Sequence, residues 1–235
     1  MKYMSDLRKI VQGTLLENEP MSRHTSYGIG GPANAYITPK DRLDLSKILK
    51  FANQHSIKTY FVGSGSNLLV ADSGIDGLVL TPAKALNQLK FDGEMVSVES
   101  GVMLGRFVKE CMKRNLSGVE SLIGVPGTLG GALVMNAGAF GSEISKCFKS
   151  VEIMNMVGDI NTYYEGDIDF AYRYSSIHED EFVLLAQFKL ISESSDFIQT
   201  KRDNASQSRK TNQPLKFRSA GSVFKNPKEN AAGYL

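Results

Sequence analysis

A glycine-rich segment at residues 124–141 constrains the fold of this chain more than any other feature of its sequence. Six of the eighteen residues are glycine, and most of the others are alanine or aliphatic. Ordering so many glycines is costly in conformational entropy, and the apolar content argues against disorder. Close packing between backbone elements is one explanation of such a segment. A large, flat ligand lying directly against the main chain explains it better.

Two further glycine-rich segments come earlier in the chain. Residues 63–67 (GSGSN) follow a strand-like run, and residues 25–33 (TSYGIGGPA) precede another. Glycine lets a ligand approach the backbone, and successive N–H groups in such a turn can bind phosphate oxygens. The spacing matches neither GxGxxG nor GxxxxGK[ST]. A tight turn explains residues 63–67 equally well in isolation, but the three segments together favour one extended ligand.

Hydrophobic periodicity predicts a mixture of helices and strands without strict alternation, which favours an α+β fold over a doubly wound sheet. Helices are expected at residues 42–55 and 103–115, and a polar helix at 196–210 with Asp196 as its N-cap. The expected strands are residues 33–39, 59–63, 77–82, 95–100, 148–155, 160–165 and 182–191. A shift to polar and basic residues near residue 195 marks a domain boundary.

Charge and composition argue against several classes of protein. The formal net charge of +2 is too small to indicate nucleic-acid binding. The N-terminus lacks the apolar region of a signal peptide, and the longest apolar stretch, residues 182–191, is too short to span a bilayer. Cys111 and Cys147 lack CxxC spacing and are expected to be buried thiols rather than a redox pair. The three histidines have no metal-ligand spacing. We therefore expect a soluble protein without metal, nucleic acid or membrane insertion.

Five motifs in order give the chain a specific resemblance. They are HTSYGIGGPA (24–33), VGSGSNLLV (62–70), GVESLIGVPGTLGGALVMNAGAFGSEI (118–144), YRYS (172–175) and AGSVFKNP (220–227). Together they resemble the UDP-N-acetylenolpyruvoylglucosamine reductases, bacterial flavoenzymes of peptidoglycan precursor synthesis. The resemblance implies an FAD-binding fold of the vanillyl-alcohol-oxidase type. It also implies flavin-holding subdomains at residues 1–82 and 83–195 and the start of a substrate domain at 196–235.

The family reaction implies two hydride steps in the cytoplasm, in a pathway that supports the cell wall, cell shape and cell division. NADPH reduces FAD, and the reduced flavin delivers hydride to the enolpyruvyl ether of the UDP-sugar, which gives UDP-N-acetylmuramate. The chemistry is the cofactor's, while the protein supplies placement, electrostatics and a proton. The cofactor-binding residues that the resemblance implies are Gly63, Ser64, Gly65, Ser66, Asn67, Pro126, Gly127, Thr128, Gly130, Gly131, Ala132 and Asn136.

Two residues match the family's catalytic positions. Hydride addition builds negative charge on the carboxylate side of the double bond, where a fixed cation lowers the barrier and a positioned acid completes the reaction. Arg173 matches the family's arginine, whose planar fork suits a carboxylate, and Ser222 matches its proton donor. By the same resemblance Lys225 and Asn226 contact the sugar nucleotide. Tyr172 either hydrogen-bonds the substrate or simply packs.

Basic residues are concentrated between residues 201 and 228, where eight lysines and arginines face a single aspartate. This excess suits a diphosphate and a carboxylate. A solvated basic helix is nevertheless the preferred interpretation for four of these residues, namely Lys201, Arg202, Arg209 and Lys210.

The chain also departs from the family pattern. The short interval between Arg173 and Ser222 resembles the class that lacks an inserted loop with a tyrosine, and the family's C-terminal catalytic glutamate would lie beyond Leu235. We therefore expect a C-terminally truncated chain with little or no activity by itself. The alternatives are another flavin oxidoreductase of the same fold, against which Tyr172, Arg173 and the 220–227 motif argue, and a non-catalytic FAD-binding remnant. Nothing in the sequence indicates an oligomeric state or a preference between NADPH and NADH.

Overall fold

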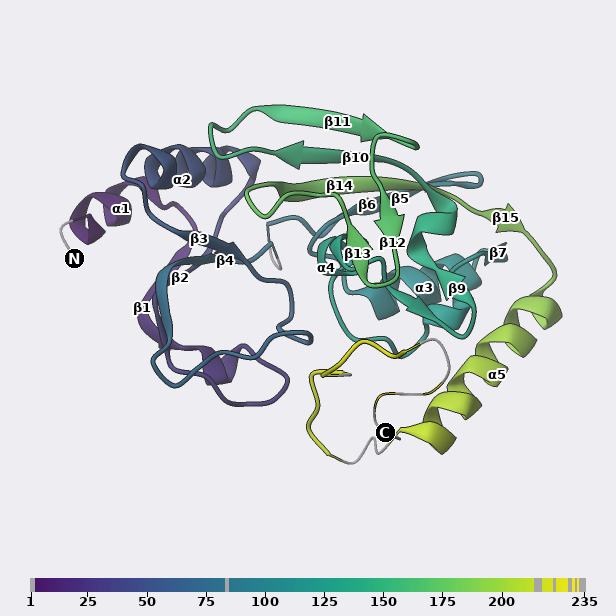
Figure 1. Ribbon diagram of the computed structural model, residues 1–235. Coiled ribbons are helices and arrows are strands. Elements are labelled where there is room, and N and C mark those ends of the chain that lie inside the picture. The colour runs from purple at the N-terminus through teal and green to yellow at the C-terminus, as the bar shows by residue number, and fades with distance from the viewer. Residues whose placement is uncertain are drawn as a thin grey trace.

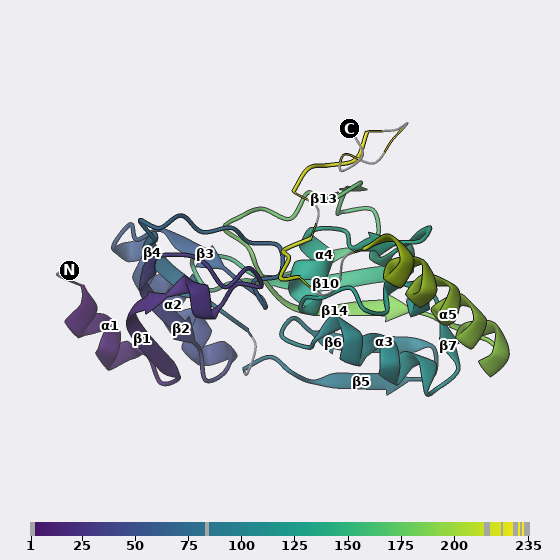
Figure 2. The same ribbon diagram turned by 90° about the horizontal axis from the view of Figure 1, so that it is seen from below.

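Two β-sheets lie side by side in the computed structural model, with helices packed on both (Figures 1 and 2). The structure describes residues 3–82, 85–213, 217–221 and 223–227, together with Asn230 and Ala232. The first sheet is built from residues before 81 and the second from residues 89–189. Within these described ranges no helix is long and apolar enough to cross a bilayer.

The first sheet has the strand order β1-β2-β4-β3. β1 is antiparallel to β2, whereas β2 and β3 both run parallel to β4. Helix α2 connects β2 to β3 and buries the apolar face that the 3.6-residue period predicts, with Leu45, Ile48 and Leu49 essentially inaccessible. The bounds are α1 Met4–Ile10, β1 Thr14–Pro20, β2 Pro32–Thr38, α2 Arg42–Gln54, β3 Thr59–Phe61 and β4 Ile75–Leu80.

The second sheet is antiparallel throughout, with the order β11-β10-β14-β6-β5. Helices α3 and α4 lie on one of its faces, where Val96 and Val98 of β6 enter a core that also contains Phe107 and Phe188. The bounds are β5 Leu89–Asp92, β6 Met95–Glu99, α3 Leu104–Met112, α4 Leu129–Val134, β10 Phe148–Met154, β11 Ile160–Tyr164 and β14 Phe182–Lys189.

Short elements complete the chain around the second sheet. Three small ladders pair β7 with β15, β8 with β9 and β12 with β13, and a long helix, α5 (Ser195–Asn212), follows β15. The strands are β7 Leu116–Ser117, β8 Gly138–Ala139, β9 Ser142–Glu143, β12 Phe170–Ala171, β13 Tyr174–Ser175 and β15 Ile191–Ser192. The 3₁₀ helices are η1 Met21–Arg23, η2 Glu120–Leu122 and η3 Ile144–Cys147.

The two sheets share an apolar core. Met154, Phe182 and Leu184 of the second sheet pack into the cluster formed by α2 and the first sheet, and the Phe182 ring meets the edge of Phe61 with centroids 4.8 Å apart. An ion pair reinforces this contact, because Arg42 of α2 lies 2.7 Å from the carboxylate of Glu152. The relative position of the sheets is therefore set by packing and charge rather than by the connecting segment.

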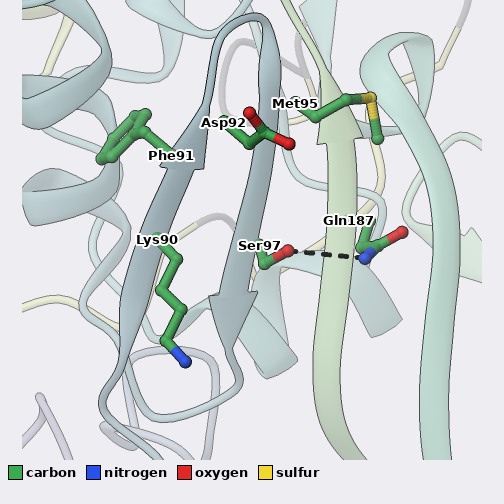
Figure 3. A pocket seen from close by; sticks show the side chains of 6 residues that line it. All are labelled: Lys90, Phe91, Asp92, Met95, Ser97 and Gln187. Atoms are coloured by element: carbon green, nitrogen blue, oxygen red, sulfur yellow. Dashed lines mark hydrogen bonds between the residues drawn. The ribbon is translucent and has the colours of Figure 1, made fainter.

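The opposite face of the second sheet carries a groove lined by both polar and apolar residues, the latter being Phe91 and Met95 (Figure 3). Lys90 and Asp92 of β5, Ser97 of β6 and Gln187 of β14 line it, and the Gln187 amide donates to Ser97 Oγ at 3.4 Å. Side chains alternate across a strand, so these residues point away from the face that α3 and α4 cover. The groove is thus separated from the glycine-rich segments by the sheet itself.

The predicted mixture of helices and strands is observed, with some corrections. The N-cap of α5 is Ser194, whose hydroxyl accepts from Phe197 N, and not Asp196, which lies in the first turn. Helix α1, strands β1 and β5 and helix α4 were not predicted. Cys111 is buried and Cys147 half-buried, and both are free thiols whose pKa is raised by burial. The division at residues 82/83 and 195/196 stays a prediction.

Asp44 gives the clearest test of how the first sheet is held. Its buried carboxylate accepts from three backbone N–H groups, Gln12 (3.0 Å), Gly13 (2.9 Å) and Lys40 (2.8 Å). We expect Asp44→Ala to lower the free energy of unfolding by about 3 kcal/mol, because it leaves these donors without an acceptor. Removing only the helix cap with Asp41→Ala should cost about 1 kcal/mol. Urea unfolding of the three proteins measures both values, and equal losses would contradict this account.

Candidate functional site

The three glycine-containing segments singled out in the sequence meet at one place. Ser26 N donates to Gly65 O at 3.0 Å, and Ser66 Oγ donates to Pro126 O at 3.3 Å. The turn at residues 63–67 therefore touches residues 24–31 on one side and residues 126–128 on the other. Because the turn follows β3 directly, the first sheet fixes its position against the loop that enters α4.

The turn at residues 63–67 presents free hydrogen-bond donors. None of its five backbone N–H groups has an acceptor within the part of the chain that the structure describes. Gly65 has φ +65°, and Ser64 and Asn67 are exposed. Consecutive free N–H groups in a turn of this kind form a concavity that binds anionic oxygens. The pyrophosphate of a dinucleotide supplies such oxygens.

The close approach of the turn to its two neighbouring segments leaves no room for a side chain at Gly63 or Gly65. A Cβ on Gly63 would lie 2.3 Å from Thr128 Oγ1, and a Cβ on Gly65 would lie 1.8 Å from the carbonyl oxygen of His24. Thr128 Oγ1 is itself buried and, among the described residues, has no hydrogen-bond partner. An unpaired hydroxyl beside free amides is expected where a polar ligand completes the hydrogen bonding. The residues present thus fit a dinucleotide cofactor.

Helix α4 and the hairpin β12–β13 carry the next part of the site. Ser175 Oγ donates to Val134 O at 2.8 Å, and the Asn136 amide donates to Ala171 O at 3.0 Å. The Asn136 amide also donates to Glu143 and accepts from Ser145 N. Asn136, predicted to line the cofactor, is therefore buried with its polar atoms engaged by protein partners. These contacts hold the β12–β13 hairpin against the end of α4.

Arg173 occupies the turn between β12 and β13 with an unusual backbone. Its φ is +57°, a left-handed conformation that costs a residue with a Cβ about 1–2 kcal/mol. The guanidinium donates to Gly138 O at 3.1 Å and lies 5.0 Å from the ring centroid of Tyr172, which is 45% exposed. No carboxylate lies within ion-pair distance of Arg173 in the described ranges. Two contacts therefore hold the guanidinium in place, and its charge has no carboxylate partner among the described residues.

The chain after α5 returns to the glycine-containing segments. The guanidinium of Arg218 lies directly on Gly28, where a Cβ would come 1.9 Å from Nη1. Ala220 is buried, whereas Lys225 and Asn226 are exposed, and Asn226 Oδ1 accepts from Ala232 N. Ser222 lies outside the described residues. Gly221 and Val223, the neighbours of Ser222 in the sequence, are described and exposed.

Two basic residues of α5 are partly exposed but contact other parts of the protein, whereas the sequence-based interpretation expected a fully solvated helix. Lys201 Nζ lies 2.7 Å from the carboxylate of Glu120, and Arg209 packs against Gly124, with its Nε buried and unpaired among the described residues. Burial lowers the pKa of Arg209. Burial alone would raise the pKa of Glu120, but hydrogen bonds from Lys201, Gly118 N and Ser117 bring it below its usual value.

Sequence reasoning missed Glu120, Arg218 and the contacts of Lys201 and Arg209. Glu120 carried a usable signal, because it is one of two acidic residues in the long motif at 118–144. Arg218 lies just before the motif at residues 220–227. Their partners are distant in sequence, so periodicity could not have identified the contacts.

The fold and this meeting of loops define an FAD-binding flavoprotein. A family model described as FAD binding domain matches residues 33–163. The wild-type glucose dehydrogenase Phl p 4.0202 superposes with a TM-score of 0.61 at 15% identity, over 83% of this chain and 45% of that chain. The structure of 6-hydroxy-D-nicotine oxidase from Arthrobacter nicotinovorans superposes with a TM-score of 0.60 at 18% identity, over 77% of this chain and 43% of that chain. These likenesses concern the fold alone, and with the family model they confirm the predicted α+β fold of the vanillyl-alcohol-oxidase type.

Relatives narrow this class to one family. The UDP-N-acetylenolpyruvoylglucosamine reductases of Clostridioides difficile (strain 630) and Bacillus licheniformis are each 37% identical to this chain. The alignments cover 99% and 100% of this chain and 77% and 78% of the relatives, respectively. The UDP-N-acetylenolpyruvylglucosamine reductase structure from Thermus caldophilus gives a TM-score of 0.80 at 29% identity, over 95% of this chain and 78% of that chain. The chain belongs to the UDP-N-acetylenolpyruvoylglucosamine reductase family, as its five motifs indicated.

Gly65→Ala tests whether the turn at residues 63–67 contacts the cofactor. The added Cβ would collide with His24 O and occupy an unfavourable φ, so the turn must move. We expect the dissociation constant for FAD to rise about tenfold or more, as measured by fluorescence titration. Gly105→Ala is the matched control, because no atom lies within 4 Å of its Cβ position. Unchanged FAD affinity in a folded Gly65→Ala protein would contradict the assignment.

Proposed function

We propose that this chain binds FAD and reduces the enolpyruvyl ether of UDP-N-acetylglucosamine enolpyruvate to UDP-N-acetylmuramate, with NADPH as reductant. The reaction belongs to cytoplasmic peptidoglycan precursor synthesis, which serves cell shape and division. Family membership supports this function. The observation that carries it is the free-amide turn at residues 63–67, in contact with the loop that leads through α4 to Arg173.

The proposed cofactor site consists of the turn at residues 63–67 and the segment from Pro126 to Ala132. The free N–H groups of the turn would bind the pyrophosphate, and Thr128 Oγ1 would gain the hydrogen-bond partner it lacks within the described structure. Asn136 would support the site indirectly, because its side-chain amide holds the β12–β13 hairpin in place. When bound, FAD supplies the hydride chemistry between NADPH and the substrate.

Arg173 is the proposed electrostatic group. Hydride addition to the enolpyruvyl double bond moves negative charge toward the substrate carboxylate, and a cation already in place stabilises that charge without reorganisation. Arg173 meets this requirement, because Gly138 O and the Tyr172 ring orient its guanidinium and no acidic side chain in the described ranges neutralises it. The exposed Tyr172, Lys225 and Asn226 are proposed to contact the substrate.

Ser222 is the proposed proton donor. The hydroxyl would transfer a proton to the substrate carbon that carries the developing negative charge. A serine is a weak acid, so neighbouring groups must hold the hydroxyl and stabilise its conjugate base. Two observations support the assignment: its place in the AGSVFKNP motif, and the contact of nearby Arg218 with the loop at residues 24–31.

Spectroscopy of the purified chain tests the proposed function directly. The protein reconstituted with FAD should show flavin absorbance in the visible range. Anaerobic NADPH should bleach this absorbance, and the enolpyruvyl substrate should restore it. NADH in place of NADPH measures the nucleotide preference. A folded protein that binds no flavin would contradict the proposal. A reduced flavin that the substrate does not reoxidise would contradict activity of these 235 residues and would agree with the expectation from the sequence that they have little or no activity by themselves.

Arg173→Lys separates the two halves of the reaction. Lysine keeps the charge but loses the planar fork and the orienting contact with Gly138 O. We expect reoxidation of the reduced flavin by substrate to slow about 10²–10³-fold, while reduction by NADPH stays unchanged in stopped-flow measurements. Arg106→Lys, at an exposed position whose guanidinium contacts Asn87, serves as the control. If both half-reactions slowed equally, Arg173 would not act on the substrate.

Ser222→Ala tests the proton donor. We expect the protein to bind FAD and oxidise NADPH as before, while substrate turnover falls about 10²–10⁴-fold, the usual effect of losing a positioned acid. Ser222→Cys, which retains an ionisable hydrogen, should keep part of the turnover. Steady-state kinetics with the enolpyruvyl substrate measures both variants. Turnover near that of the parent in Ser222→Ala would exclude this role.

A further inference from the structure

Glu120 is a buried carboxylate at the start of the glycine-rich segment. It lies in η2, four residues before Gly124, and its side chain is inaccessible to solvent. Three donors reach it: Ser117 Oγ at 2.9 Å, Gly118 N at 2.6 Å and Lys201 Nζ at 2.7 Å. A buried carboxylate is tolerated only when such partners compensate its lost hydration. The first two donors are local, whereas Lys201 comes from α5.

Helix α5 packs along residues 120–124, the segment that begins with Glu120. Lys201, Ala205 and Arg209 share one face of the helix, because they are spaced by four residues. Lys201 contacts Glu120, Ala205 is buried, and Arg209 lies against Gly124, 3.0 Å from its Cβ position. Gly124 has φ +77°. One face of α5 thus contacts both ends of the segment from residue 120 to residue 124, immediately before the proposed cofactor loop.

The same helix leads into the chain that bears the proposed substrate residues. After α5 the chain reaches Arg218, which covers Gly28, and then the exposed Lys225 and Asn226. In chain order, α5 therefore comes directly before Arg218 and the motif at residues 220–227. In the described structure α5 contacts η2 and α3, and Lys201 supplies its only ion pair to another element.

We propose that Glu120 and Lys201 are positioning residues, whose ion pair places α5 and the following segment against the cofactor loop and thereby sets affinity for the UDP-sugar. This inference rests on the proposed function. Neither residue contacts the reacting atoms. The pair fixes α5, and with it the chain after α5, relative to the segment that leads to Pro126. Its loss should therefore weaken substrate binding while leaving FAD binding and the reduction of FAD by NADPH unaffected.

Lys201→Met is the principal test, because Glu120 keeps its two local donors, Ser117 Oγ and Gly118 N, in this variant. Circular dichroism and thermal unfolding check that the variant is folded, since the buried carboxylate loses one of its partners. We expect KM for the enolpyruvyl substrate to rise roughly 5- to 50-fold, in the range of typical coupling between sites. The FAD dissociation constant and the rate of flavin reduction should stay within about twofold of the parent, a split that general loss of structure would not produce. Lys201→Arg preserves the charge and should restore the parental KM. Lys210→Met, on an exposed part of α5, is the control.

Glu120→Gln combined with Lys201→Met completes a double-mutant cycle. If the two residues act as one unit, the double variant should show a KM no higher than that of the worse single variant. Additive effects would overturn the pairing. An unchanged KM in Lys201→Met, or a parallel loss of FAD affinity, would overturn the positioning role.

Hydrogen exchange separates this inference from the proposed function. Amides of α5 should exchange faster in Lys201→Met than in the parent, whereas amides of α3 should not. This measurement needs no substrate. Unchanged exchange in α5 refutes the role of the pair even if the enzyme is active. Faster exchange in α5 together with a parent that does not act on the UDP-sugar would instead refute the proposed function.

Discussion

The close approach of three backbone segments is the constraint on which the rest of this structure depends. Residues 24–31, 63–67 and 126–128 can meet only because Gly63 and Gly65 lack a Cβ, at distances where a methyl group would overlap Thr128 or His24. At this approach the N–H groups of the turn have no acceptor, and a threonine hydroxyl has no partner, in the described part of the chain. The packing of backbone on backbone thus creates the polar surface that an FAD-binding protein requires.

This approach in turn requires that the two sheets be fixed relative to each other. The turn at residues 63–67 is attached to the first sheet, whereas residues 126–128 enter α4, which packs on the second. The shared core around Phe182 and the ion pair between Arg42 and Glu152 fix the position of one sheet relative to the other. A buried apolar contact is well suited to this task, since close packing resists small displacements. The geometry of the loops is therefore a property of both sheets.

Local sequence patterns predicted those parts of the structure that local physics determines. Helices α2 and α3 have apolar residues at helical spacing, and the strands of the second sheet are rich in β-branched residues, so both were recognisable. Helix α4 was hidden because Gly130 and Gly131 lower its intrinsic propensity, and tertiary packing supplies what propensity lacks. The family motifs identified the loops and Arg173, but no motif indicates that Lys201 meets Glu120. That contact exists only after the chain has folded, and for that reason α5 looked like a solvated basic helix.

The left-handed backbone of Arg173 has a consequence for how this position tolerates change. Glycine would relieve the strained turn at no steric cost, whereas most other side chains, asparagine and aspartate excepted, retain the strain. The substitution that best suits the local backbone therefore also deletes the cation. Selection for thermostability alone would therefore favour a hairpin without this cation. A library screened only for heat resistance should accordingly be counter-screened for flavin reoxidation, since under the proposed role of Arg173 stability and chemistry compete at this residue.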